Sequence, residues 1–174
     1  TEAKHLRRNV RFTMKSYLAC AYEAMGKYDK ALSVLGAMPE QKGARQRQAQ
    51  AIIAAQRCGV YLSMGKLDKA RQEYQALQAA GSSAVKEQTM ELLRIRIALA
   101  EGKSTKKDEA YVLLAISKSA TLLQKNELKL LLGRIYAQMG ESELSAAYLK
   151  EVSACPKELH ITADAKSELA RLAK

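Results

Sequence analysis

Apolar residues recur every three to four positions along most of the chain, and short polar turns separate the periodic segments. This period is typical of helices that each bury one face. The pattern therefore predicts an all-α fold. The predicted helices cover residues 3–25, 28–38, 44–64, 67–80, 84–101, 107–118, 123–139, 142–154 and about 162–173.

The last predicted helix has one apolar stripe, formed by Ala165, Leu169 and Leu172. Thr162 is a suitable N-cap for it, because a threonine hydroxyl accepts a hydrogen bond from the first turn of a helix. Pro156 ends the preceding helix, since proline cannot donate to the helical ladder. A terminal amphipathic helix of this kind is expected to cover the exposed end of the fold.

A short sequence pattern recurs at a regular distance. Residues 22–31 read YEAMGKYDKA and residues 61–70 read YLSMGKLDKA. Two weaker copies end at Gly102 and Gly140, so the turn glycines Gly26, Gly65, Gly102 and Gly140 lie 39, 37 and 38 residues apart. A fixed period of this size is typical of proteins built from repeated helical hairpins.

Each copy has the features of two helices joined by a tight turn. The glycine can take the left-handed conformation that closes a helix, and an acidic residue near the start of the next helix suits its dipole. A small residue lets the two helices approach, and a tyrosine fills the space between them. The acidic positions are Asp29, Asp68, Asp108 and Glu143, the small ones Ala31, Ala70 and Ala110, and the tyrosines Tyr22, Tyr61 and Tyr136.

These residues resemble the tetratricopeptide repeat, in which a Leu-Gly or Leu-Ala pair is followed by Tyr, Gly, Ala and a large residue. The first copy has Leu18-Ala19, Tyr22, Gly26, Ala31 and Leu35, and the fourth has Leu132-Gly133, Tyr136, Gly140, Ser145 and Leu149. The resemblance implies an α-α superhelix, a helical hairpin solenoid that forms a single repeat domain over residues 1–174. Its repeats are expected at about 3–38, 44–80, 84–118 and 123–154, followed by a capping helix at about 162–173.

The period departs from that family. The tetratricopeptide repeat has about 34 residues, and the spacing here is about 38. The extra residues lie in the connections 38–43, 80–85 and 118–122 or lengthen the first helices. The period alone leaves other helical-hairpin solenoids, of the HEAT type, open as an alternative, whereas the GKYDKA turn favours the tetratricopeptide reading.

The resemblance also implies a function and a surface. Repeats of this kind hold a peptide or helix of another protein on a concave face lined by the first helix of each hairpin. The register places Thr13, Ser16, Cys20 and Glu23 there in the first copy, and Ile52, Ala55, Gly59 and Leu62 in the second. The last two copies contribute Leu92, Arg96 and Leu99, then Leu130, Arg134 and Gln138.

Arg96 and Arg134 occupy equivalent positions 38 residues apart. Two guanidinium groups on one wall can hold a carboxylate of a ligand, but an ion pair with a nearby glutamate is the favoured interpretation of each. Ser16, Cys20, Ala55 and Gly59 stand where the family members that clamp the tails of chaperones have lysine and asparagine. These small and apolar residues favour an apolar or helical ligand instead.

The net charge of +11 leaves two further functions open. The positive excess is largest in residues 1–50, around Lys4, Arg7, Arg8, Arg11 and Lys15. Such a cluster can bind nucleic acid or an anionic membrane surface. The single phenylalanine and the lack of tryptophan argue against base stacking.

The start of the chain bears on its location. The sequence contains no apolar run long enough for a transmembrane helix, and its first residue is threonine. We therefore expect a cytoplasmic protein, or a fragment that forms the cytoplasmic tail of a membrane-anchored one. The GKYDKAL turn and the terminal ELARL segment resemble repeat domains of bacterial proteins.

No motif for catalysis, for a metal or for a cofactor is evident. His5 and His160 lack acidic or cysteine partners at ligand spacing, and the Gly-Lys pairs in the turns lack the flanking glycines of a phosphate loop. Cys20, Cys58 and Cys155 are far apart and are expected to be buried apolar residues. The chain is accordingly predicted not to be an enzyme.

Overall fold

The computed structural model describes residues 2–81 and 85–173, with the side chains of residues 6–43, 45–81 and 85–173. Over these residues the chain is helical and has no strand. The helices are α1 (Glu2–Ala24), α2 (Tyr28–Gly36), α3 (Ala44–Ser63), α4 (Leu67–Ala80), α5 (Glu87–Ala100), α6 (Lys106–Lys118), α7 (Leu122–Gln138), α8 (Ser142–Ser153) and α9 (His160–Leu172). The all-α prediction is confirmed, and the chain is a solenoid-type array of helical hairpins.

Most predicted boundaries differ from the observed ones by one or two residues. The fifth helix begins at Glu87, whereas its predicted start was residue 84. Residues 82–84, which include that predicted start and part of the predicted 80–85 connection, lie outside the described residues. The side chains of Lys4 and His5 lie outside them too. Among the helices that the structure describes, none is long and apolar enough to cross a membrane.

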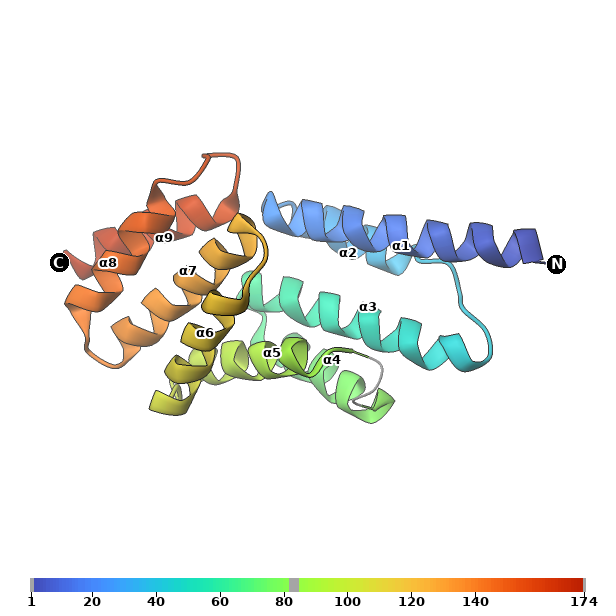
Figure 1. Ribbon diagram of the computed structural model, residues 1–174, viewed down its shortest axis with the longest axis horizontal. Helices are drawn as coiled ribbons and strands as arrows, with labels where there is room; N and C mark the ends of the chain where they lie inside the picture. The colour runs from blue at the N-terminus through green and yellow to red at the C-terminus, as the bar shows by residue number, and fades with distance from the viewer. Residues whose placement is uncertain (1, 82–84, 174) are drawn as a thin grey trace. The chain divides into compact units, whose positions relative to one another are not determined.

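The chain forms two compact units, one up to Ile97 and one from Ala98 onward. In the first unit α1 packs on α2, α3 on α4, and α2 and α1 also contact α3 (Figure 1). In the second unit α6 packs on α7, α7 on α8, and α9 on both α8 and α7. The predicted single domain over 1–174, with four repeats, stays a prediction.

The four turn glycines close their helices as expected. Their φ angles are 68°, 69°, 75° and 80° for Gly26, Gly65, Gly102 and Gly140. In each turn the N–H after the glycine donates to a carbonyl five residues earlier, as in a Schellman motif. The pairs are Lys27 to Tyr22 at 2.8 Å, Lys66 to Tyr61 at 2.9 Å, Lys103 to Ala98 at 2.8 Å and Glu141 to Tyr136 at 2.9 Å.

The small residues behind these turns are buried in the first, second and fourth copies and exposed in the third. Ala31, Ala70 and Ser145 are fully buried, whereas Ala110 is exposed, so its predicted role is wrong. The reason is a longer turn: α6 begins four residues after Gly102, whereas the equivalent helices begin two residues after their glycines. Asp108 takes the buried position instead.

Asp108 is accommodated there because it is part of a capping box. Its carboxylate accepts hydrogen bonds from the Thr105 N–H at 2.8 Å and from the Thr105 hydroxyl at 2.9 Å. These bonds replace the hydrogen bonds to water that the carboxylate loses when it is buried. The predicted acidic residue in the first turn of this helix is therefore confirmed.

The C-terminal helix α9 covers the last hairpin. Ile161 and Ala165 are buried against Leu130, Leu149 and Val152, and Leu169 and Leu172 pack against the same cluster. The predicted apolar stripe is confirmed. Thr162 is not the N-cap, because α9 begins two residues earlier and the Thr162 hydroxyl donates to the Pro156 carbonyl at 2.9 Å.

Candidate functional site

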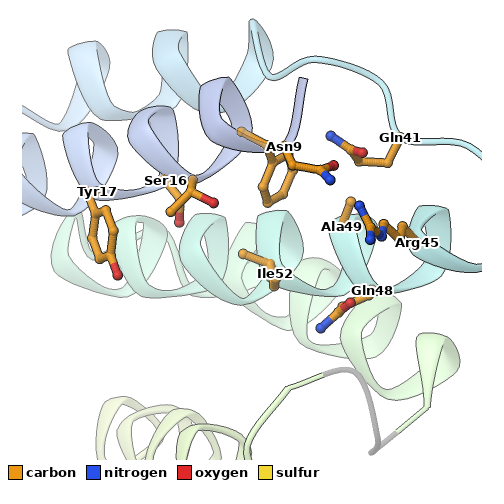
Figure 2. Close-up of a pocket in the computed structure, with 10 residues that line it drawn as sticks. Asn9, Ser16, Tyr17, Gln41, Arg45, Gln48, Ala49 and Ile52 are labelled. Atoms are coloured by element: carbon orange, nitrogen blue, oxygen red, sulfur yellow. The ribbon is translucent and has the colours of Figure 1, made fainter. Parts of the chain in front are cut away.

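A pocket of about 500 Å³ lies between α1 and α3, with a wall from the segment that precedes α3 (Figure 2). Phe12, Ala49 and Ile52 form its apolar part, and Phe12 and Ala49 are buried. Polar side chains supply the rest of the lining. They are Asn9, Thr13, Ser16, Tyr17, Gln41, Arg45 and Gln48.

The pocket brings together three of the predicted groove residues, Thr13 and Ser16 from α1 and Ile52 from α3. The residues that sequence reasoning missed lie mainly one or two turns nearer the start of each helix, and their i, i+3 and i, i+4 spacing was a signal for them. Gln41 comes from the connecting segment, which no helical register could place. The lining is more polar than the predicted apolar groove.

One hydrogen-bonding group in the pocket wall has no partner in the part of the chain that the structure describes. The amide nitrogen Nε2 of Gln41 is buried and lacks a hydrogen-bond partner among the described residues. An unsatisfied buried donor costs about 1–3 kcal/mol. A ligand carbonyl that reaches Gln41 would recover part of that free energy.

Gln56 joins the two helices at one end of the pocket. Its Nε2 atom lies 2.8 Å from the Ser16 hydroxyl oxygen, 3.2 Å from the Ser16 carbonyl oxygen and 3.0 Å from the Cys20 sulfur. These contacts hold α1 and α3 in one register. The hydroxyl and carbonyl oxygens of Ser16 are therefore already hydrogen-bonded to Gln56, and Cys20 is exposed beside Ser16.

A polar cluster lies further along α1 and α3, where Arg96 of α5 joins them. Arg96 donates to the Ser63 hydroxyl at 3.0 Å and to the Gly59 carbonyl at 3.2 Å, and Ser63 donates to Glu23 at 3.3 Å. A Cβ atom at Gly59 would lie only 3.3 Å from the Glu23 carboxylate and 3.5 Å from the Arg96 guanidinium. The glycine thus leaves room for both charged groups and gives Arg96 access to the helix backbone, and Arg96 is held within the first unit.

Arg134 is also held within the chain. Its guanidinium donates to Glu168 at 2.5 Å and to Asp164 at 2.8 Å, both on α9. This is the ion pair with neighbouring acidic residues that the sequence favoured over a ligand carboxylate. Leu130, a predicted groove residue, is 4% exposed in the core beneath α9. Leu130 is therefore not open to a ligand, whereas the Arg134 side chain is 35% exposed and its role in binding a ligand stays a prediction.

The other predicted groove positions differ in exposure. Ala55 is buried, Leu62 is partly buried against the α3–α4 core, and Leu92 and Leu99 are half-buried. Gln138 is exposed. A role of these residues in binding a partner stays a prediction.

The three cysteines differ from the expectation that all would be buried. Cys58 is fully buried, Cys155 is half-buried, and Cys20 is exposed, so the prediction is wrong for Cys20. Burial raises the pKa of the Cys58 thiol to about 12, although the nearby Arg96 guanidinium acts in the opposite direction. The Cys58 thiol is therefore protonated near neutral pH.

Alkylation should separate these thiols. With iodoacetamide at about pH 8, we expect Cys20 to react at least a hundredfold faster than Cys58, because only an accessible thiolate attacks the reagent. Peptide mapping by mass spectrometry measures both rates, and a Cys20→Ser variant should lose the fast reaction. Equal rates for Cys20 and Cys58 in the native protein would contradict the burial of Cys58.

The hairpins, their glycine turns and the terminal helix define an α-helical repeat protein. A family model, the tetratricopeptide repeat, matches residues 127–153, which span most of α7 and α8. The match contains Gly133, Tyr136, Gly140, Ser145 and Leu149, the residues that carry the pattern in that copy. The hairpin formed by α7 and α8 is thus of the tetratricopeptide type, and the all-helical array around it is consistent with a repeat protein of that type. No curated protein and no solved structure gave a match to it.

Proposed function

We propose that this chain is a scaffold that holds a peptide or helix of a partner protein in the pocket between α1 and α3. Tetratricopeptide repeats generally mediate protein–protein interactions and are typically non-enzymatic. The observation that carries the proposal is the pocket itself, whose lining includes three of the groove residues predicted for the first two copies, Thr13, Ser16 and Ile52.

The lining of the pocket favours a polypeptide ligand. Amide and hydroxyl groups from three segments surround a small apolar floor. Such a lining can bond the backbone of a peptide and seat one apolar side chain on Ile52 and Ala49. The pocket lining is less suited to nucleic acid. Among the described residues of the lining, Tyr17 is the one exposed aromatic ring on which a base could stack, and Arg45 is the one cation that could bind a phosphate.

A random peptide library tests the proposal without knowledge of the partner. Peptides selected on the wild-type protein should bind the Ile52→Lys variant at least about tenfold more weakly, since a half-buried apolar contact in the pocket is replaced by a charge. Thr13→Arg, which narrows the pocket from its exposed rim, should have a similar effect. Isothermal titration calorimetry measures both affinities.

A matched control keeps the test specific. Leu122→Lys adds the same charge at a leucine that is 74% exposed at the start of α7, far along the chain from the pocket. It should leave peptide binding unchanged, and circular dichroism should show that all variants are folded. The proposal fails if the selected peptides bind Ile52→Lys and the wild type equally well.

A further inference from the structure

The outward side of α1 carries a continuous row of large apolar side chains. Leu6 is 67% exposed, Val10 49%, Met14 66% and Tyr17 73%. Their spacing of four, four and three residues puts them on one side of the helix. Phe12 and Ala19, by contrast, are buried on the opposite side, where α1 packs on its own unit. We call Leu6, Val10, Met14 and Tyr17 the α1 stripe.

The α1 stripe is unusual for a surface. Isolated exposed hydrophobic residues are normal, whereas contiguous ones mark interaction sites. Five of the eleven large apolar residues exposed in the described part of the chain are on α1, with Leu18 as the fifth, and Met25 directly follows the helix. A helix of this length, with one side packed and the other apolar, has the pattern of a helix that contacts neighbours on two sides.

Arginines line one edge of the α1 stripe. Arg7 and Arg11 are exposed and lie one helical turn apart. Arg7 is three residues before Val10 and seven before Met14, so its guanidinium lies beside the row. The opposite edge, at Asn9 and Thr13, is polar without charge.

The other end of the chain shows how such a surface is covered. There α9 places Ile161 and Ala165 on the apolar side of the last hairpin. Asp164 and Glu168, one turn apart on α9, bind Arg134 of α7 at 2.8 and 2.5 Å. The covering helix therefore combines an apolar stripe with carboxylates that neutralise the arginine beneath it.

From this likeness we propose that the α1 stripe is a second docking surface, which receives an amphipathic helix of a partner protein with acidic residues along one edge. The apolar row of that helix lies on Leu6, Val10, Met14 and Tyr17. Its carboxylates, spaced one turn apart, bind Arg7 and Arg11. This surface is distinct from the pocket of the proposed function, although Tyr17 borders both.

The charges favour an acidic helix over two other occupants. A second copy of this chain would bring its own arginines to the same contact, and the net charge of +11 opposes self-association. A helix that lies in an anionic membrane surface is usually rich in Lys and Arg over its whole polar face. Here the basic edge is on one side only, which suits a single helix laid beside it.

Two designed helical peptides test the proposal. Each has about 18 residues, or about 27 Å of helix, and the same leucine row, with glutamates along one edge in the first and lysines in the second. Fluorescence anisotropy should show that the wild-type protein binds the glutamate peptide at least about tenfold more tightly than the lysine peptide. Met14→Glu should abolish the binding of the glutamate peptide.

Charge reversal gives the sharpest readout. The double variant Arg7→Glu/Arg11→Glu should prefer the lysine peptide, a reversal that loss of folding cannot produce. Leu122→Glu, at an exposed leucine of α7, is the matched control and should bind as the wild type does. Ile52→Lys, which alters the pocket and not the α1 stripe, should also bind the glutamate peptide as the wild type does. The pocket proposal and the stripe proposal can therefore fail independently of each other.

Three outcomes would overturn the proposal. The first is equal binding of the glutamate peptide to wild type and Met14→Glu. The second is binding to vesicles that contain phosphatidylserine, lost in Met14→Glu, with no binding of either peptide, which assigns the stripe to a membrane. The third is a dimer in sedimentation experiments that Met14→Glu dissociates, which assigns it to a second copy.

Discussion

Replacement of Leu149 by alanine is expected to lower the free energy of unfolding by about 2–5 kcal/mol, the range for removal of a buried leucine side chain. Leu149 is fully buried in the cluster that joins α7, α8 and α9, where it contacts residues such as Leu130 and Val152. The cavity would therefore weaken all three helices. Urea denaturation of the full chain, followed by circular dichroism, measures the change.

Leu144 provides a matched control on the same helix. It is 45% exposed, so Leu144→Ala removes the same atoms with little loss of buried area. A change within about 0.5 kcal/mol is expected for such a surface position. Similar losses for Leu149→Ala and Leu144→Ala would contradict the assignment of Leu149 to the core.

Gly133 is the second position with a large expected effect. A Cβ atom there would lie 3.0 Å from both Cγ and Cδ2 of Leu149 and 3.5 Å from the Ser145 carbonyl oxygen. Because Leu149 is fully buried, it has little room to move. We expect Gly133→Val to lower the free energy of unfolding by about 1–3 kcal/mol, as overpacking does in a dense core.

Two further variants isolate this contact. Gly36 has no neighbour within 4 Å of the position of a Cβ atom, and Gly36→Val should therefore have a much smaller effect. The double variant Gly133→Val/Leu149→Ala should lose less stability than the sum of the single changes, because the valine fills part of the space that Leu149 vacates. Strict additivity in urea denaturation would show that the two residues do not meet.

The helices and turns could be predicted from the sequence because local physics determines them. The apolar period gave the positions of the helices, and the glycines gave the left-handed turns at residues such as Gly26 and Gly65. Ala31, Ala70 and Ser145 were placed correctly since their turns have the same length. Where the turn is longer, after Gly102, the register failed and Ala110 was placed inside.

The site was less predictable because it depends on contacts between distant segments. The family register put Leu130 and Arg134 on an open surface, but Leu130 is buried beneath α9 and Arg134 is paired with Glu168 of that helix. The four-residue spacing of Asp164 and Glu168 was a signal for a partner arginine, although the sequence alone does not say which arginine. Gln41 belongs to an irregular segment, so its place in the pocket wall followed from no periodic pattern.

The longer turn before α6 has a consequence for comparisons between copies. Alignment of the helix N-caps would match Leu113 with the buried Leu35 and Leu149, each eight residues after its N-cap residue. Leu113 is instead 38% exposed, and Val112 is buried in its place. One residue along a helix is a rotation of about 100°. Homologues should thus vary freely at 113 and conserve an aliphatic residue at 112, the reverse of what the consensus of the other hairpins suggests.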